Sequence, residues 1–307
     1  MAKWLSLQCD SSQMLSRIID FDMKQERIKF TKMHGIGNDY IYIDCMQSTP
    51  ERLDELSQEM SERHCGVGGD GIILILPSDL ADFKMRIFNA DGSEARMCGN
   101  GSRCVGKYVF DHGLTSKTSV SLETLAGIKI LKLHVGADGL VDAVTVDMGE
   151  PVADASQVPV KSMDAQMIDA EVATSAGDLH MTALSMGNPH GVVFVDDLAS
   201  VDIHTIGREL ELHPMWPDRA NIEFAQVLSP DLILMRVWER GSGETMACGT
   251  GACATAVAGV ITGRCDRDVT VRLLGGDLRI HWEPKNGHVY MTGSATEVFT
   301  GTYTRIS

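Results

Sequence analysis

The stretch NADGSEARMCGNGSRC (residues 89–104) is echoed about 150 positions later by ERGSGETMACGTGAC (residues 239–253), and the two segments share one pattern. Each has a Gly/Ser/Glu turn, then a cysteine in C-G-[NT]-G, then a run typical of a helix. Cys98 and Cys248 are separated by 150 residues (248 − 98), and Glu94 and Glu244 keep the same offset. Self-similarity at a fixed offset indicates a repeated architecture, here a duplicated domain.

Other positions keep this offset. Asn38 of MHGIGNDYIYID corresponds to Asn188 of SMGNPHGVVFVD. Gly71, which precedes the apolar run IILIL, corresponds to Asn221, which precedes IEFA. The repeat predicts two homologous halves, at about residues 28–150 and 176–307, connected by residues 151–175. Matching positions would then meet across a pseudo-two-fold axis, in a cleft between the halves where small-molecule sites tend to form.

The local pattern predicts an α+β fold. Runs of β-branched and apolar residues favour strands at 40–44, 71–76, 84–89, 191–196 and 232–239. Helices are expected at 98–113 and 248–263, each ending near a glycine, and at 53–63 and 203–213. A strand pair within 118–149 matches one within 268–293. We therefore expect each half to be a central helix wrapped by strands.

Composition limits the class of protein. The 307 residues are 44% hydrophobic, and the formal net charge is −15. An acidic chain repels nucleic acid and anionic membrane surfaces. No apolar run approaches the ~18 residues of a spanning helix, and residues 1–27 lack the apolar core of a signal peptide. We expect a soluble cytoplasmic protein.

No bound metal or cofactor is expected either. The eight cysteines include no C-x-x-C pair, so a structural zinc site is not indicated. The sequence also contains no Walker motif and no complete G-x-G-x-x-G after a strand.

The paired cysteines indicate acid/base chemistry. Each stands just before the first turn of its helix, where free N–H groups and the helix dipole are expected to lower the pKa of a thiol. The flanking glycines let a carboxylate approach the amides of both helix starts. The α-carbon that bears this carboxylate would then lie between the two sulfurs. One thiolate could remove the α-proton, and the opposite thiol could protonate the other face of the carbon. Cys104 and Cys253, inside the helices, are expected to be buried hydrophobic residues.

Other functions compete with this interpretation. A cysteine hydrolase or acyltransferase would use Cys248 as nucleophile and His190 as base, but it would leave Cys98 unexplained. A catalytically inactive binding protein of the same fold should have lost one of the cysteines.

The segments HGIGNDY, GVGGDG, FNADGSEARMCGNGSRC, MGNPH and ERGSGETMACGTGAC closely resemble diaminopimelate epimerases, across nearly all of residues 28–307. The resemblance implies two pseudo-symmetric domains, each a helix within a curved mixed sheet, with the active site between them. It also implies that residues 294–307 return to the first domain, which leaves 151–293 as the second and 1–27 as an N-terminal extension.

The activity implied is an isomerase reaction without pyridoxal phosphate, the conversion of LL-2,6-diaminopimelate to its meso form for lysine and peptidoglycan synthesis. A homodimer is implied as well. Proline racemases and hydroxyproline epimerases share the two-cysteine plan and are the alternative function, although they lack this combination of motifs.

The resemblance also assigns site residues. Cys98 and Cys248 would be the two bases, and the reacting carboxylate would be held by Gly99, Asn100, Gly249 and Thr250. The substrate pocket would be lined by Asn38, Asn89, Asn188, Asn221, Glu239 and Arg240. Arg240 is suited to the second carboxylate of the substrate, because a guanidinium makes two parallel hydrogen bonds to it. His190 is either a core histidine or a hydrogen-bonding partner near the thiols. Gly71 stands where some family members carry a substrate-contacting glutamine.

Overall fold

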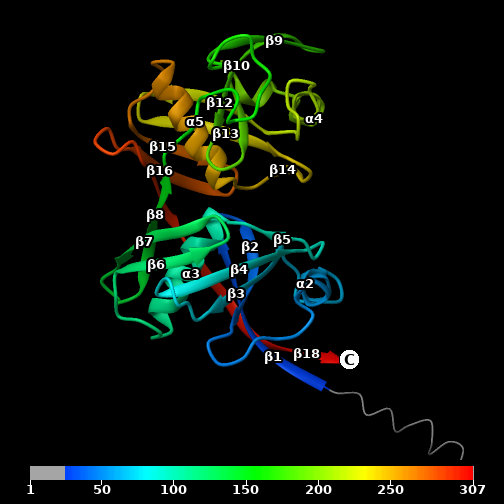
Figure 1. Cartoon of the computed structure of the whole chain (residues 1–307), viewed down its shortest axis with the longest axis vertical. Coiled ribbons are helices and arrows are strands. Elements are labelled where there is room, and N and C mark those ends of the chain that lie inside the picture. Colours follow the sequence, from blue (N-terminus) through cyan, green and yellow to red (C-terminus); the bar gives the residue numbers. More distant parts are fainter. Residues whose placement is uncertain (1–24, 307) are drawn as a thin grey trace, which may run out of the picture.

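The structure is a computed structural model that describes residues 25–306. Most of the extension expected at residues 1–27 therefore lies outside the described residues, while residues 25–27 belong to the first strand. The described chain forms two lobes that follow one another along the long axis of the molecule (Figure 1). Each lobe contains one of the two helices that follow a repeated cysteine.

The first lobe contains eight strands of the N-terminal half and two helices. Its elements are β1 (Gln25–Gly35), β2 (Asn38–Asp44), α2 (Leu53–Ser61), β3 (Gly71–Leu76), β4 (Phe83–Asn89), β5 (Glu94–Ala95), α3 (Gly99–Asp111), β6 (Ser119–Thr124), β7 (Gly127–Val135) and β8 (Val141–Gly149).

The second lobe repeats this order. Its elements are β9 (Ala170–Thr174), β10 (Gly177–Ser185), β11 (Pro189–Phe194), the short 3-10 helix η1 (Leu198–Ser200), α4 (Ile203–Glu211), β12 (Asn221–Ser229), β13 (Leu232–Glu239), β14 (Gly243–Thr245), α5 (Gly249–Ile261), β15 (Asp268–Leu273), β16 (Gly276–Trp282) and β17 (Val289–Ser294). The last strand, β18 (Thr296–Ile306), leaves this lobe and pairs antiparallel with β1 of the first.

The two lobes have the same strand order. Pairing runs β18-β1-β2-β3-β4-β6-β7-β8 in the first lobe and β9-β10-β11-β12-β13-β15-β16-β17 in the second. Each lobe has two parallel pairs of strands. In the first lobe they are β2 with β3 and β4 with β6, and in the second they are β11 with β12 and β13 with β15. Antiparallel pairing of β8 with β17 joins the lobes.

The repeat predicted from the sequence is present in these elements. Helices α3 and α5 begin 150 residues apart (249 − 99), and so do α2 and α4 (203 − 53). One expectation was wrong, because 118–149 and 268–293 each contain three strands rather than a pair. The additional strands are β8 and β17, which pair with each other across the lobes, and no local sequence pattern reveals so distant a partner.

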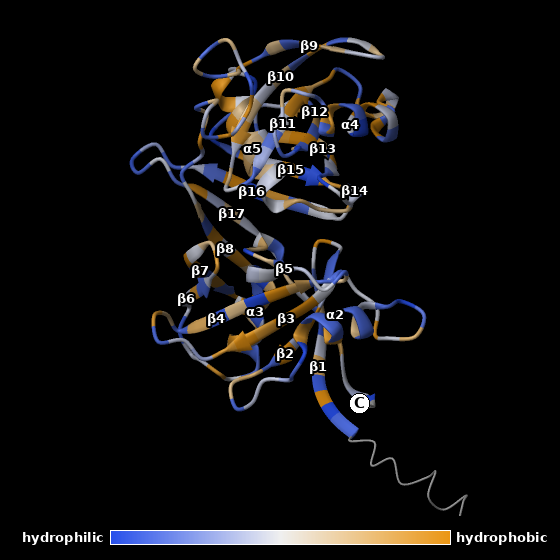
Figure 2. Ribbon diagram, turned by 45° about the vertical axis from the view of Figure 1, so that its right-hand side comes forward, coloured by the Kyte–Doolittle hydropathy of each residue, from blue (hydrophilic) through white to orange (hydrophobic). Residues whose placement is uncertain are grey.

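Both central helices are buried along most of their length, and in α5 the buried side chains are small and apolar. In α5, ten of the eleven residues from Gly249 to Gly259 are buried, all except Thr250, and they include Ala252, Cys253, Ala254 and Ala256. Apolar strands surround both helices, while the loops are mostly hydrophilic (Figure 2). One hydrophobic cluster includes residues of both lobes, and separate clusters lie under α2 and α4. The lobes therefore share a core at the level of the repeated cysteines.

No helix within residues 25–306 is long and apolar enough to cross a membrane.

Candidate active site

Both repeated cysteines are the N-cap residues of the buried helices, as the sequence predicts. Cys98 has an extended backbone, and its sulfur accepts a hydrogen bond from the Gly101 amide at 3.3 Å. Cys248 repeats this geometry, with the Gly251 amide 3.4 Å from its sulfur. Each thiol thus satisfies one of the N–H groups that a helix start leaves without an intrahelical partner.

A cavity of about 760 Å³ lies between the lobes and contains both thiols. Two predicted residues do not line it: Asn221 lies behind the wall, and His190 is fully buried. The predicted residues that do line it are Asn38, Asn89, Cys98, Gly99, Asn100, Asn188, Glu239, Arg240, Cys248, Gly249 and Thr250.

The two helix starts converge on one methionine. A Cβ placed on Gly99 would lie 2.8 Å from Met291 Cε, and one placed on Gly249 would lie 3.0 Å from Met291 Sδ. Asn100 crosses between the lobes, donating from Nδ2 to the carbonyl of Ala247 at 3.2 Å. The free amides of two helices therefore meet at the floor of one cavity, and such amides with their helix dipoles favour an anion.

Burial sets the acidity of the thiols. Burial raises the pKa of Cys98 to about 11, although the Gly101 amide and the charge of Arg103 act in the opposite direction. The pKa of Cys248 is raised well above its usual value, first by burial and then by the carboxylates of Glu239 and Glu223. The expected lowering of the thiol pKa is therefore wrong. The helix start does favour the thiolate, but removal from water outweighs it.

The two asparagines beside the thiols are held by different partners. The Cys98 thiol donates to Oδ1 of Asn38 at 3.4 Å, and the Asn38 amide donates to Asp70 at 2.8 Å. On the other side, Asn188 Oδ1 lies 3.1 Å from Nε2 of His190.

His190 itself is oriented by Glu223, whose Oε1 lies 2.7 Å from the ring Nδ1. Both ring nitrogens are thus engaged away from sulfur, and His190 acts on Asn188. The pairing of Cys248 with His190 that a cysteine hydrolase requires is absent from the described residues.

Arg240 stands at the edge of the cavity with its guanidinium exposed. Its backbone amide donates to Oδ1 of Asn221 at 2.8 Å, and Nη1 donates to the carbonyl of Asp218 at 3.1 Å. Within residues 25–306, no carboxylate lies within 4.0 Å of the guanidinium. Glu239 is turned toward Thr245, whose hydroxyl donates to it at 2.5 Å, and burial raises the pKa of this carboxyl. The arginine thus keeps donors for a ligand.

Tyr40 is a cavity residue that the sequence interpretation missed. Its hydroxyl donates to Oδ1 of Asn89 at 3.3 Å. A Cβ on Gly71 would lie 2.9 Å from Tyr40 Cε1 and would clash with the carbonyl of Phe88, so no side chain fits at position 71 in this backbone. A usable signal existed, because Tyr40 follows Asn38 by two residues on the same strand and therefore faces the same side.

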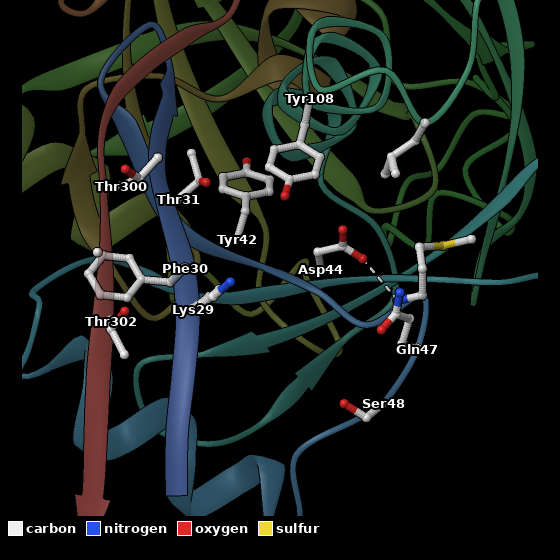
Figure 3. Close-up of a pocket in the computed structure, with 13 residues that line it drawn as sticks. Lys29, Phe30, Thr31, Tyr42, Asp44, Gln47, Ser48, Tyr108, Thr300 and Thr302 are labelled. Carbon is white, nitrogen blue, oxygen red and sulfur yellow. Dashed lines mark hydrogen bonds between the residues drawn. The ribbon is translucent and has the colours of Figure 1, made fainter.

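A second cavity of about 670 Å³ lies in the first lobe and contains none of the predicted site residues. Its wall is formed by β1, β2 and β18, with Tyr42 and Tyr108 side by side at one end (Figure 3). Residues 25–306 hold no group of three or more His, Cys, Asp or Glu side chains arranged to bind a metal ion.

Comparison with known proteins gives one family. A profile of diaminopimelate epimerases matches residues 30–153 and 182–298. The chain is 53% identical to the diaminopimelate epimerase of Acetivibrio thermocellus over 275 residues, covering 89% of this chain and 98% of the relative. It is 54% identical to that of Phocaeicola vulgatus over 277 residues, covering 89% and 97%.

Solved structures share the fold at much lower identity. A hydroxyproline epimerase from Agrobacterium vitis superposes with a TM-score of 0.66 at 17% identity, covering 93% of each chain. A phenazine biosynthesis protein from Bacillus anthracis gives 0.64 at 17% identity, covering 92% of this chain and 100% of the other. These similarities concern the fold alone, two pseudo-symmetric α+β domains.

Proposed function

The chain belongs to the diaminopimelate epimerase family, and we propose that it converts LL-2,6-diaminopimelate to meso-diaminopimelate, using Cys98 and Cys248 as its two bases and no pyridoxal phosphate. The observation that carries this proposal is the placement of the two thiols. Each caps a buried helix, and both helices open into one cavity between the lobes. The product serves lysine and peptidoglycan precursor synthesis.

The proposed reaction begins with the reacting carboxylate on the amides of the two helix starts. One cysteine, as thiolate, takes the α-proton, so that a C–H bond breaks and an S–H bond forms. The electron pair is delocalised into the carboxylate, whose growing charge meets amides that are already oriented. The opposite thiol then gives its proton to the other face. The two sulfurs have exchanged protonation states, and exchange with solvent restores the starting form.

We expect the thiolate to form as the substrate binds, with the thiol proton released to solvent, because burial raises the pKa of both thiols. A ligand that closes the cavity brings an ammonium group close to sulfur, and a nearby cation lowers the pKa of a thiol. The cavity of about 760 Å³ is larger than a seven-carbon substrate needs, so we expect the lobes to close on it.

The far end of the substrate distinguishes diaminopimelate from other amino acids. Arg240 faces the cavity with free donors and would hold the distal carboxylate. Asn89, from the other lobe, is placed to contact the distal ammonium group. A cyclic imino acid has no second carboxylate, so a proline or hydroxyproline racemase would have no use for Arg240.

Proton NMR in D₂O tests the proposal. LL-diaminopimelate incubated with the protein should acquire deuterium at the α-carbon as the meso isomer appears. L-proline and trans-4-hydroxy-L-proline serve as matched substrates for the alternative. Exchange of these imino acids, with diaminopimelate left unchanged, would reject the proposed substrate and favour the racemase.

A cytoplasmic homodimer is the proposed state of the protein. Strand β18 pairs only with β1 among the described residues, so its other edge is open, and Val298 and Phe299 on it are 54% and 46% exposed. Open edges and exposed apolar side chains favour association. Sedimentation equilibrium should give twice the chain mass, and Phe299→Asp should lower it. A monomeric wild-type protein would remove the dimer from the proposal.

A further inference from the structure

Arg103 is the largest side chain that is completely buried in the described chain, and its charge has no carboxylate partner. Its Nε donates to the carbonyl of Ser294 at 3.1 Å, and Nη1 lies 3.5 Å from the carbonyl of Gly99. Its Nη2 has no hydrogen-bond partner. Taking a cation out of water without an opposite charge costs several kcal/mol, so such a residue requires an explanation.

The other buried cations of the described chain are neutralised. Arg305, 4% exposed, makes a two-pronged contact with Glu59 at 2.9 and 3.0 Å. Lys32, 7% exposed, lies 2.5 Å from Asp39. Arg103, at 0%, differs from both, since no acidic side chain of residues 25–306 lies within 4.0 Å of it.

The guanidinium lies directly behind the floor of the cavity. Its Nη1 is 3.8 Å from Sδ of Met291, the methionine on which both helix starts converge. Glycines leave it room on two sides, because a Cβ on Gly35 would lie 2.9 Å from Nη2 and one on Gly293 would lie 3.1 Å from Nε. The charge is therefore separated from the helix starts at Gly99 and Gly249 by one side chain, that of Met291.

The titratable groups that face Arg103 are thiols and a phenol: Cys98 and Cys104 on its own helix α3, Cys253 on α5 and Tyr42 on β2. Glu239 on β13 is another charged group near Cys98, and its carboxylate raises the pKa of the Cys98 thiol. Cys104, Cys253 and Tyr42 lie outside the cavity lining, so Cys98 is the group through which the guanidinium can act on the reaction.

We propose that Arg103 is an electrostatic positioning residue, a fixed buried cation that supports the negative charge held by the Cys98 thiolate and the reacting carboxylate during epimerisation. This inference rests on the proposed two-thiol function and extends it to a residue that never touches the substrate. It explains why the guanidinium has no acidic partner among residues 25–306, because its counter-charge is the thiolate that forms during the reaction. The direction in which Arg103 moves the pKa of Cys98, downward, agrees with this role.

The test compares Arg103→Gln, which keeps a hydrogen-bonding group but removes the charge, with Arg103→Lys, which keeps the charge. One readout is the pH profile of kcat/KM on LL-diaminopimelate. The other is the pH dependence of Cys98 alkylation by iodoacetamide, followed by peptide mapping without substrate. Loss of the cation should move both profiles to higher pH by about one unit or more. At pH 7, kcat/KM of Arg103→Gln should fall about tenfold or more and recover in part at higher pH.

Arg305→Gln is the control for removing a buried arginine of the same lobe that is remote from the cavity. It should lower the melting temperature and leave both profiles in place. A lowered melting temperature with unmoved profiles in Arg103→Gln would make Arg103 only a structural tether and overturn the proposal. If Arg103→Gln does not fold, the uncharged variant Arg103→Met takes its place: profiles moved to higher pH support the role of the charge, and unmoved profiles overturn it. Because alkylation needs no substrate, it tests Arg103 even if the protein does not epimerise diaminopimelate.

Discussion

At the scale of single residues, the two copies of the C-G-[NT]-G motif lie in different surroundings. Cys98 has an amide oxygen and a buried cation beside it, whereas Cys248 has two carboxylates and the Thr250 hydroxyl at 3.5 Å. A nearby anion disfavours a thiolate and a cation favours it. The buried cation beside Cys98 therefore favours its thiolate, whereas the two carboxylates near Cys248 oppose one.

The first prediction concerns these thiols. Replacing Cys98 or Cys248 with alanine removes one of the two proton carriers, so epimerisation of LL-diaminopimelate should fall by roughly 10³-fold or more, in line with the loss of an essential acid or base. Steady-state kinetics measures it. Cys65→Ala is the matched control, because Cys65 is exposed and lies outside the cavity, and it should behave as the wild type. Near-normal turnover of Cys98→Ala would end the two-base proposal.

The second prediction concerns recognition of the distal carboxylate by Arg240. Arg240→Ala leaves that carboxylate without its charge-assisted partner in a closed site, a loss of about 2–5 kcal/mol. That corresponds to roughly 30- to 5,000-fold in kcat/KM. Part of the loss should appear in kcat, because remote binding energy positions the reacting carbon. Arg240→Lys should rescue poorly, since an ammonium cannot reproduce the planar fork.

Kinetics of both Arg240 variants on LL-diaminopimelate provides the measurement. Wild-type constants in both would show that Arg240 is a surface residue and that another group recognises the distal end.

Residues of the repeated motifs that line the cavity could be predicted from the sequence, whereas those behind them could not. Asn38 and Cys98 belong to motifs that repeat at a fixed offset, so their partnership is visible in the sequence. Asp70 acts through Asn38 and Glu223 through His190, 32 and 33 positions away in the sequence. Arg103 contacts Met291, 188 positions away, and nothing in the sequence fixes which way these three side chains point. Their roles depend on burial and distance, which only the folded structure supplies.

At the scale of elements, the repeated helices depend on glycines at matching positions. Gly101 and Gly251 occupy the same place in α3 and α5, and each donates its amide to the capping sulfur. A Cβ on Gly101 would lie 2.7 Å from Cδ1 of Ile73, the mobile end of an apolar side chain. A Cβ on Gly251 would lie 2.5 Å from Oε1 of Glu223, which holds His190. Equivalent substitutions should therefore have different consequences.

The third prediction compares these two glycines. Gly251→Ala displaces Glu223, which disturbs His190 and then Asn188, so kcat/KM should fall by about 10- to 100-fold, together with roughly 1–3 kcal/mol of stability from overpacking. Gly101→Ala, the matched control, should cost stability while kcat/KM stays within a few-fold of the wild type. Kinetics and thermal unfolding of both variants test it. Equal losses of activity would mean that the Glu223 contact does not matter for catalysis.

The elements themselves were predicted unevenly. The helices after Cys98 and Cys248 were found because a capping position, a small apolar run and a terminal glycine agree with one another. Strands β8 and β17 were not separated from their neighbours, since each pairs along one edge with a strand of the other lobe. Strand β9 falls within residues 151–175, which were expected from the sequence to form the connection between the halves. Among residues 25–306 it pairs with β10 alone.

At the scale of the whole molecule, the chain crosses between the lobes twice, after β8 and after β17. The second crossing places β18 on β1, and Arg305 near the end of β18 binds Glu59 of α2. The first lobe is thus completed only by the last residues of the chain. The arrangement ties both ends of the described chain to one lobe and leaves the cavity between two connected bodies.

The fourth prediction concerns the N-terminal end. The family profile begins at residue 30 and β1 begins at Gln25, so removal of residues 2–23 should leave kcat/KM and the melting temperature unchanged. Removal of residues 2–30 also deletes Ile28 and Phe30, which are 4% and 8% exposed, and six residues that pair with β18. Two buried side chains of this kind contribute roughly 1.5–3 kcal/mol each. That loss is comparable to the total stability of about 5–15 kcal/mol of a typical domain.

The longer deletion should therefore yield a protein that is largely unfolded at 37 °C or aggregates, and thermal unfolding followed by circular dichroism measures the difference. Aggregation has a specific cause, because removing half of β1 exposes the paired edge of β18, which then presents free N–H and C=O groups. Arg305→Gln, which loosens β18 without shortening the chain, should fall between the two deletions. A melting temperature lowered by several degrees in the shorter deletion would show that residues before β1 contribute to the folded state.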